Sequence, residues 1–322
     1  MRSRWIKSVL AISLAAGATG ATSTSAFANT DNLPVYRHVF YIVEENRSFS
    51  QIIGNPDAPT FNQLATQYSL ATSYFGTSHP SEPNYVAMVG GSDFGITNDG
   101  SYVTNRVDAP SLASQLEDHH LSWKSYSQSL PFAGFTGTCY PCNSTDPSSL
   151  YASKHNGFLD FAGVQDNPAE MQKSVPIEQL STDLENNNVP TFSFIVPDQC
   201  HDMHGTNDCP DATTNVKVAD AYASDLVDSI TSSAAWRDGL NAIVVTWDEG
   251  TTAAGCCDAN PGGGQIYTSV ITNHGPRGLT YTTPSNHYSM LATLQDMWHL
   301  GCLQNTCDTA NVVATNRLFS VN

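Results

Sequence analysis

The stretch NAIVVTWDEG, from Asn241 to Gly250, joins a run of β-branched and aromatic residues to an abrupt Asp-Glu-Gly ending. Two other stretches have the same form, HVFYIVEEN (His38 to Asn46) and TFSFIVPDQ (Thr191 to Gln199). Near-continuous apolar runs of this length are typical of strands that are buried on both faces. TSVITN, from Thr268 to Asn273, is a shorter candidate strand. These runs predict a mostly parallel sheet whose strands end in polar residues.

Segments with helical periodicity lie between the predicted strands. Apolar or aromatic side chains recur at helical spacing at Leu112, Leu116 and His119, at Val218, Tyr222, Leu226 and Ile230, and at Leu291, Leu294 and Trp298. Strands that alternate with helices predict an α/β fold with a mostly parallel central sheet and helices on both faces. No internal repeat and no Gly/Ser/Pro-rich linker divides the chain, so we predict a single domain over residues 29–322.

The first 28 residues have the pattern of a secretion signal. Arg2, Arg4 and Lys7 precede an apolar core from Val9 to Ala16, and Ala26-Phe27-Ala28 has the form of a cleavage site. The apolar core is too short to span a bilayer, and no later segment is long and apolar enough. We therefore predict an exported protein, secreted or periplasmic, without stable membrane insertion. A retained N-terminal anchor is the alternative.

The chain is strongly acidic, with a formal net charge of −17. Removal of the three basic residues of the predicted signal would lower this charge from −17 to −20. Such a charge argues against non-specific binding to nucleic acid or to anionic membranes, which needs basic patches. It also repels phosphate, so a phosphate site would need a local positive source such as a metal ion.

Eight cysteines in an exported chain predict four disulfides. Eight cysteines allow about 105 pairings, of which local pairing of Cys200 with Cys209 and of Cys302 with Cys307 is the simplest. The other four form two close pairs, which could bond internally or with each other: Cys139 with Cys142, and Cys256 with Cys257. A zinc knuckle built from these four is the alternative.

Acidic and amide side chains follow two of the predicted strands. Glu45 and Asn46 end the first strand, and Asp248 and Glu249 end the last of the long ones. The carboxyl ends of parallel strands form the usual site edge of an α/β sheet, so we expect these residues to lie together. Their oxygens suit hard divalent cations. The pattern predicts a site for calcium, magnesium, manganese or zinc, the alternative being acidic strand ends that only face water.

Ser81 lies in SHPSEPNYVAMVGG, Ser78 to Gly91, between two prolines and directly before an apolar run that reads as a helix start. This position would leave Ser81 near the positive N-terminal end of the helix. No G-x-S-x-G motif surrounds it, so stabilisation of its alkoxide by a metal is the route by which it could become a nucleophile. Asn84 could point its amide at the same anion, or could make a helix-start hydrogen bond.

Histidines lie in two loop-like segments, KHN (Lys154 to Asn156) and HDMHG (His201 to Gly205). A histidine in such a position can donate to phosphate oxygens or protonate a leaving alkoxide. Zinc binding by His201 and His204 would require a helix, which Pro197 and Gly205 disfavour. His287, in NHYS, is either another site residue or a capping histidine.

Six short motifs, taken in order, resemble the phosphoesterase family of secreted acid phosphatases and bacterial phospholipases C. They are VEENRSF, HPSEPNY, KHN, DMH, TWDEG and NHYS. Each motif alone is weak, but six in the same order are specific. The resemblance runs from about His38 to Trp298 and implies a fold like that of alkaline phosphatase.

The resemblance also implies roles for individual residues. Glu45 and Asn46 match the family's glutamate-asparagine metal ligands, and Asp248 and Glu249 match its acidic metal pair. Ser81 matches the metal-bound nucleophile, which is threonine in the phospholipases.

The histidines complete the comparison. His155 and His204 match histidines that contact phosphate or act as acids, with Asp202 a candidate to orient His204, whereas His201 stands where close relatives are expected to have asparagine. Together these matches imply metal-dependent hydrolysis of a small phosphate monoester through a phosphoserine on Ser81. A phosphodiesterase or phospholipase C on the same core is one alternative, and a non-catalytic secreted binding protein is another. The sequence does not indicate an oligomeric state.

Overall fold

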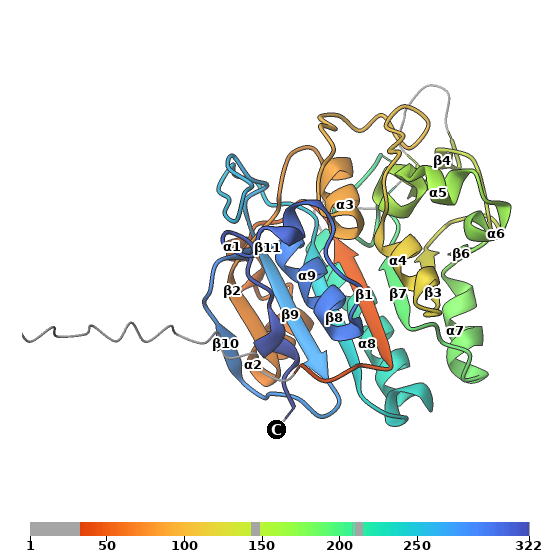
Figure 1. Cartoon of the computed structure of the whole chain (residues 1–322). Helices are drawn as coiled ribbons and strands as arrows, with labels where there is room; N and C mark the ends of the chain where they lie inside the picture. Colours follow the sequence, from red (N-terminus) through yellow and green to blue (C-terminus); the bar gives the residue numbers. More distant parts are fainter. Residues whose placement is uncertain (1–32, 143–148, 208, 210–214, 322) are drawn as a thin grey trace, which may run out of the picture. The chain divides into compact units, whose positions relative to one another are not determined.

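A computed structural model describes residues 33–142, 149–207, 209 and 215–321. Its centre is a nine-stranded sheet (Figure 1). Its strands are β1 (His38–Glu44), β2 (Ser69–Phe75), β3 (Trp123–Ser127), β6 (Ser174–Pro176), β7 (Phe192–Val196), β8 (Asn241–Trp247), β9 (Gln265–Thr272), β10 (Leu279–Tyr281) and β11 (Ser285–Asn286). The strand order is β10-β2-β9-β8-β1-β7-β3-β6, and β11 pairs with β2. A separate antiparallel pair joins β4 (Cys139–Tyr140) to β5 (Tyr151–Ala152). The predicted signal segment, residues 1–28, lies outside the described residues.

The sheet is mostly parallel, as predicted. β1 lies between β7 and β8 and is parallel to both, so Tyr41 has Phe194 on one side and Val244 on the other. β9 contains the predicted short strand but is antiparallel to both of its neighbours, β8 and β2. Its carboxyl end therefore lies at the edge opposite to the carboxyl ends of β1 and β8. For this reason β9 contributes its amino end, and not its carboxyl end, to their edge.

Helices cover both faces of the sheet (Figure 1). They are α1 (Phe49–Ile52), α2 (Pro59–Gln67), α3 (Ser81–Gly90), α4 (Leu112–Asp118), α5 (Ala162–Gln165), α6 (Pro168–Met171), α7 (Glu178–Glu185), α8 (Asn215–Ser232) and α9 (His287–Trp298). On one face, Phe194 of β7 packs edge-on against Tyr85 of α3. On the other, Trp247 of β8 packs against Phe61 of α2, with ring centroids 4.9 Å apart. The predicted architecture of an α/β sheet between two helical layers is confirmed.

The buried face of α8 differs from its predicted apolar stripe. Leu226 and Ile230 are buried as expected, but Val218 is 37% exposed. Ala219 and Ala223 are fully buried instead. Small side chains allow a helix to lie close to the sheet, so the alanines rather than the bulkier residues form the contact at this end of α8. Among the described helices, none is long and apolar enough to cross a membrane.

All eight cysteines are paired, each with its nearest neighbour in sequence. The disulfides are Cys139–Cys142, Cys200–Cys209, Cys256–Cys257 and Cys302–Cys307. No free cysteine remains in the chain. The prediction of four disulfides agrees with the structure, and the zinc-knuckle alternative does not.

Thiol titration of denatured, unreduced protein is expected to find no free thiol, because each cysteine has a bonded partner. The same sample after full reduction serves as the control and should yield eight thiols per chain. Four or more thiols before reduction, together with one zinc ion per chain, would contradict the disulfide assignment.

Candidate functional site

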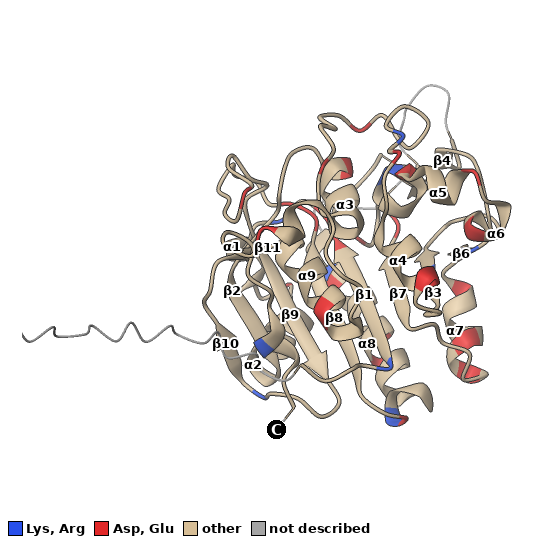
Figure 2. Ribbon diagram, viewed as in Figure 1, with Lys and Arg blue, Asp and Glu red and all other residues tan. Residues whose placement is uncertain are grey.

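The carboxyl ends of β1 and β8 meet beneath the N-terminus of α3, where acidic residues mark the tip of β1 (Figure 2). The backbone of Asp248 donates to the carbonyl of Glu44 at 2.9 Å, which extends the pairing of β1 and β8 past Trp247. The backbone of Asn46 donates to Oδ1 of Asp248 at 3.1 Å. The two acidic strand ends that the sequence identified are therefore in direct contact.

Asn46 turns the chain sharply at the end of β1. Its φ of 56° lies in the left-handed region, which asparagine tolerates better than most residues. Its side-chain amide donates to Oε2 of Glu45 at 2.9 Å. This contact orients the Glu45 carboxylate and leaves the amide oxygen of Asn46 as an acceptor for another group.

Ser81 is the first residue of α3 and is 2% exposed. Its Oγ lies 3.0 Å from Oε2 of Glu45 and 3.3 Å from Oε1 of Glu249. A hydroxyl has one proton, so it can donate to only one of these carboxylates at a time. The serine that the sequence singled out thus faces carboxylates from the ends of both strands.

The carboxylates at this edge are buried with few compensating charges. Glu45 and Asp248 are fully buried, and Glu249 is 4% exposed. Burial raises the pKa of Glu45, and burial together with repulsion from Glu45 and Glu249 raises the pKa of Asp248. Oδ2 of Asp248 has no hydrogen-bond partner among the described residues. Since buried anions require a proton or a cation, this donor set fits a divalent metal ion.

His155, the last residue of a short 3₁₀ helix (Ser153–His155), lies on the other side of Glu45. Its Nε2 is 3.0 Å from Oε1 of Glu45, and its Nδ1 is 3.5 Å from Oδ2 of Asp202. The ring stacks on Tyr85, with centroids 5.2 Å apart. Burial, with help from the positive charge of Lys154, lowers the pKa of His155 well below its ordinary value. We therefore treat His155 as a neutral imidazole.

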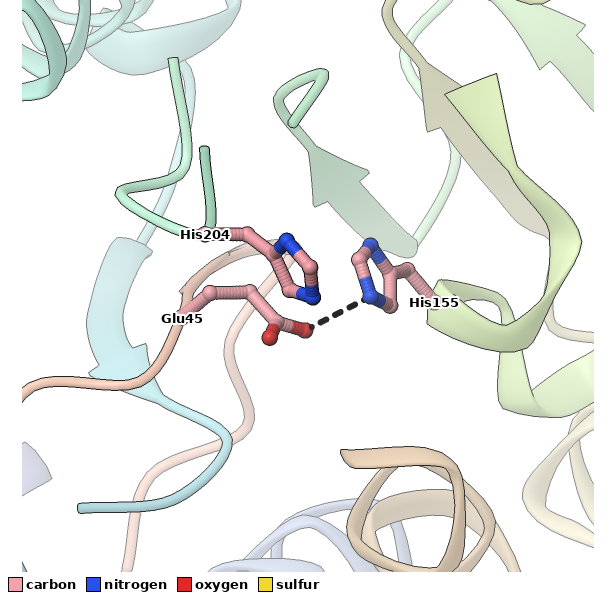
Figure 3. Close-up of side chains that lie close together, drawn as sticks. All are labelled: Glu45, His155 and His204. Carbon is pink, nitrogen blue, oxygen red and sulfur yellow. Dashed lines mark ion pairs between the residues drawn. The ribbon is translucent and has the colours of Figure 1, made fainter. Parts of the chain in front are cut away.

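His204 points its ring toward Glu45 and His155 (Figure 3). Its backbone N–H donates to Oδ1 of Asp202 at 2.7 Å. Its Nδ1 lies 2.8 Å from the carbonyl oxygen of Gly205 and so carries the proton of that hydrogen bond. Nε2 of His204 is consequently the nitrogen that faces the site. Asp202 holds the backbone of His204 rather than its ring.

Two overlapping sets of side chains are candidates for holding a metal ion, one predicted from the sequence and one that the structure brings together. One is the oxygen set at the strand ends, formed by Glu45, Asn46, Asp248 and Glu249 with Ser81. The other is formed by Glu45, His155 and His204, whose ligand atoms all lie within 4.8 Å of one another. Histidine nitrogen suits zinc and other transition metals, whereas an all-oxygen set suits calcium, magnesium or manganese.

The side chain of Asn84 makes the helix-start hydrogen bonds that were one of its two predicted roles. Both protons of its amide are used, in bonds to the carbonyl oxygens of Ser78 at 2.9 Å and Pro80 at 3.1 Å. Its amide oxygen accepts from Thr77 N at 2.8 Å and from Ser78 N at 3.0 Å. No amide proton remains for the other predicted role, donation to an anion beside Ser81. Asn84 instead holds the turn that carries Ser81.

The glycine-rich loop that contains Gly263 and Gly264 packs against the turn that precedes Ser81. The backbone of Gly76 donates to Gly264 and accepts from Gly263, both at 2.9 Å. A Cβ atom at Gly263 would lie 2.5 Å from the carbonyl oxygen of Ser78. Only glycine permits this close approach, so the loop and the turn before Ser81 are packed backbone to backbone.

Of three basic residues near the site, the sequence assigns no role to His79 or Lys154 and leaves His287 open as a site residue or a cap. His79 contacts Oε2 of Glu249, and this hydrogen bond raises the pKa of His79. Lys154 pairs with Asp99 at 2.8 Å. Nε2 of His287 donates to the backbone carbonyl of Asp248 at 2.6 Å.

His287 is not the cap of its helix, and its ring contacts the backbone of Asp248 at the site. Burial lowers the pKa of His287 to about 4, so the ring is neutral and Nε2 carries its proton toward Asp248. The N-cap of α9 is Asn286, whose side chain accepts from Ser289 N. His201 lies apart from the site, with Nδ1 bonded to Asp198 at 2.7 Å and its ring beside Tyr222.

Sequence comparison finds relatives of this chain in bacteria and fungi. The chain is 34% identical over 294 residues to a phosphatidylinositol-3-phosphatase of Mycobacterium tuberculosis, a match covering 91% of this chain and 86% of the relative. It is 29% identical over 245 residues to a phosphate-repressible acid phosphatase of Penicillium chrysogenum, covering 75% of this chain. That match spans only 55% of the Penicillium protein.

Solved structures share the fold at low sequence identity. A protein of the alkaline phosphatase superfamily from Vibrio parahaemolyticus superposes with a TM-score of 0.51 at 12% identity, covering 83% of this chain and 67% of that one. A sulfatase from a Pseudoalteromonas species gives 0.52 at 11% identity, covering 89% and 72%. The Phosphoesterase family matches residues 55–301. With this match, and with the 34% identity to the mycobacterial relative, the chain belongs to the Phosphoesterase family.

Proposed function

We propose that the protein is an exported phosphatase that hydrolyses phosphate monoesters through a phosphoserine on Ser81. The observation that carries this proposal is the position of the Ser81 hydroxyl, at a helix N-terminus and within 3.0 to 3.3 Å of buried carboxylates from two strands. Family membership and the acid phosphatases among the relatives support phosphate esters as the substrate class. Residues 29–322 form the catalytic domain in this proposal.

A divalent metal ion would supply the positive charge that this acidic site needs to accept phosphate and to favour the alkoxide of Ser81. Its ligands are proposed to be Glu45, Asn46, Ser81, Asp248 and Glu249. The protein's own contribution is to fix these groups: His287 holds the backbone of Asp248, and Asn84 holds the turn before Ser81. Phosphoryl transfer depends mainly on such positioning and on electrostatics.

The Ser81 hydroxyl passes its proton to the carboxylate of Glu45 or Glu249, and its oxygen forms the new bond to phosphorus as the bond to the alcohol oxygen breaks. The departing oxygen takes the Nε2 proton of His204, which acts in its imidazolium form and keeps its Nδ1–H on the carbonyl of Gly205. The neutral ring of His155 lies between Glu45 and Asp202. In this scheme it contacts phosphate oxygens. Attack of water on the phosphoserine returns Ser81 and releases phosphate.

Release of inorganic phosphate from p-nitrophenyl phosphate tests the proposed reaction directly. The diesterase alternative predicts faster hydrolysis of bis(p-nitrophenyl) phosphate than of the monoester. A non-catalytic binding protein would release phosphate from neither ester at any metal concentration.

Loss of His204 is expected to affect alkyl phosphates far more than aryl phosphates. A nitrophenolate leaves without a proton, whereas an alkoxide is strongly basic and needs one. General acid catalysis typically contributes about 10²–10⁴-fold, so His204→Ala should lower kcat/KM for an alkyl phosphate by that order and for p-nitrophenyl phosphate by much less. The measurement is kcat/KM for both substrates.

His155→Ala is the matched comparison, because His155 lies beside His204 with ring centroids 5.6 Å apart. If His155 contacts only phosphate oxygens, its loss should slow both substrates to a similar degree. If His204→Ala lowers kcat/KM equally for both substrates, His204 binds phosphate oxygens and is not the acid. If the larger loss for the alkyl phosphate appears in His155→Ala instead, His155 is the acid and His204 binds phosphate.

A further inference from the structure

A cavity of about 810 Å³ opens beside the cluster of Glu45, His155 and His204. His204 belongs to both the cluster and the cavity wall, and Lys154, which precedes His155, also lines the cavity. A phosphate ester bound with phosphorus at Ser81 and its leaving oxygen at His204 would therefore place its alcohol in this cavity. The lining of the cavity should then decide which alcohols are accepted.

Most of the residues that line the cavity carry polar side chains. Ligand pockets of this size are mostly lined by apolar and aromatic side chains. Here, among the described residues of the wall, only Ala152 and the disulfide-bonded Cys139 carry apolar side chains. The others are glycines or bear hydroxyl, amide, imidazole or charged groups.

Gln199 and Ser101 present open hydrogen-bonding groups on this wall. Gln199 is 4% exposed, and its Nε2 donates to the carbonyl of Ser149 at 2.6 Å, so the orientation of the amide is fixed. Its Oε1 accepts no hydrogen bond from the described residues and remains an acceptor. Ser101 is bonded through its backbone N–H to Glu82, while its hydroxyl has no partner among the described residues.

The nearby aromatic side chains do not line the cavity. In the β4–β5 pair, Cys139 lies opposite Ala152, and both line the wall. Their neighbours Tyr140 and Tyr151 project from the other side of this pair, because successive residues of a strand alternate. There they pack against Phe135, each with ring centroids 6.0 Å apart. An aryl group in the cavity would therefore meet no Phe, Tyr or Trp ring among the described residues of the wall.

The charge of the wall is balanced. Lys154 is paired with Asp99 at 2.8 Å, and the described wall contains no other lysine or arginine. The chain as a whole carries a formal charge of −17. A second phosphate or a carboxylate on the alcohol would have no free cation to meet, so the wall suits a neutral group.

We propose that this cavity is the alcohol subsite of the phosphatase and that it takes a neutral, polyhydroxylated alcohol, such as a sugar or a polyol. This inference rests on the proposed function. Hydroxyl groups replace the water that the polar wall loses on binding, whereas an alkyl or aryl group of equal size leaves the wall groups without partners. Gln199 Oε1 and the Ser101 hydroxyl are the groups assigned to bind substrate hydroxyls.

Two substrates with the same six-carbon chain test this assignment, sorbitol 6-phosphate and n-hexyl phosphate. The wild-type protein is expected to favour the sorbitol ester in kcat/KM by at least about tenfold, since a site built for hydroxyls discriminates strongly against analogues that lack them. Ser101→Gly and Gln199→Met should each reduce this ratio by about fivefold, the typical effect of one neutral hydrogen bond.

Ser101→Gly is the more stringent variant, because Ser101 has a φ of 64° that glycine adopts without strain. Gln199→Met also removes the bond to Ser149, so its thermal unfolding is measured alongside. Ser232→Ala on α8, where the hydroxyl bonds only within its own helix, is the control and should leave the ratio unchanged.

The possible outcomes distinguish failure of the subsite assignment from failure of the proposed reaction. Hydrolysis of neither ester, nor of p-nitrophenyl phosphate, overturns the proposed function itself. If both esters are hydrolysed with a kcat/KM ratio near one, and Ser101→Gly does not change that ratio, only the subsite assignment is overturned. Inositol monophosphate in solution and a phosphatidylinositol monophosphate in phosphatidylcholine vesicles carry the same polyol. Turnover of the soluble form supports a free polyol ester, and turnover confined to vesicles overturns it in favour of a lipid headgroup.

Discussion

Replacement of Ser81 by alanine is expected to lower kcat by at least about 10³-fold, as loss of a covalent nucleophile does in other hydrolases. The expectation follows from the geometry of the hydroxyl, which lies between carboxylates of β1 and β8 and is 2% exposed. The fold should survive the change. Glu45 keeps the hydrogen bond from the side chain of Asn46, so removal of the serine hydroxyl does not leave that carboxylate without a donor.

Ser78→Ala is the matched control, because Ser78 lies in the same turn and its hydroxyl bonds only to the carbonyl of His79. Its activity should stay close to that of the wild type. Ser81→Thr keeps the hydroxyl and should retain more activity than Ser81→Ala. Acid quenching during turnover should trap phosphate on Ser81, which peptide mass analysis detects. A folded Ser81→Ala protein with more than about a hundredth of wild-type kcat would exclude Ser81 as the nucleophile.

The strand runs of the sequence were sufficient to predict that acidic strand ends meet at one edge of the sheet. His38–Glu44 and Asn241–Trp247 are apolar almost throughout and end in acidic residues, and the structure pairs them in parallel. Parallel pairing of these neighbouring strands places their carboxyl ends together, where Asn46 contacts Asp248; the sequence predicted the shared edge but not that the two strands are neighbours. Ser81 was found in the same way, from a helix start that follows a proline.

Other features have no signal in a single sequence. The direction of β9 is one, because apolar periodicity is the same for a parallel and an antiparallel strand. The contact of Asn84 is another: a residue one turn into a helix can bond to the preceding turn or to a ligand, and here the carbonyls of Ser78 and Pro80 take both protons. The sequence likewise does not show that His287 reaches the backbone of Asp248, 39 positions away.

Exhaustive chelation is expected to lower kcat/KM by at least about 10²-fold, with recovery on addition of the correct divalent ion, because the acidic site otherwise repels phosphate. Asp248→Asn should weaken metal binding more than about 100-fold, since even residues that only support a ligand contribute 10- to 100-fold. Asparagine at this position still accepts from Asn46 N, so the change removes charge while keeping shape. Elemental analysis and metal titration measure the effect.

Asp183→Asn is the control for metal content, because Asp183 is an equally buried carboxylate that pairs with Lys124 and Tyr126 away from the site. His155→Ala and His204→Ala distinguish the two ligand sets. If the oxygen set holds the ion, both variants keep their metal, and if the histidines hold it, both lose it. Full activity after chelation, with no metal in the protein, would contradict metal dependence altogether.

Removal of the metal should also change how stability depends on pH. Burial raises the pKa of Glu45 and of Asp248 in the folded, metal-free protein, so the folded state binds these protons more tightly than the unfolded chain does. The stability gained from these protons is fully present below the unfolded pKa of about 4 and is lost as pH rises through the folded values.

Each proton that titrates in this way lowers the free energy of unfolding by up to about 1.4 kcal/mol per pH unit. A bound divalent ion replaces the protons and removes this dependence, because it binds only the ionised carboxylates. Chemical denaturation of metal-free protein from pH 4 to pH 8 should therefore show falling stability, and metal-loaded protein should not. In metal-free Asp248→Asn the decline should be shallower than in the wild type, since one of the two buried acids can no longer ionise. A metal-free wild-type protein whose stability rises over this range would show that these carboxylates are compensated by groups of the protein itself.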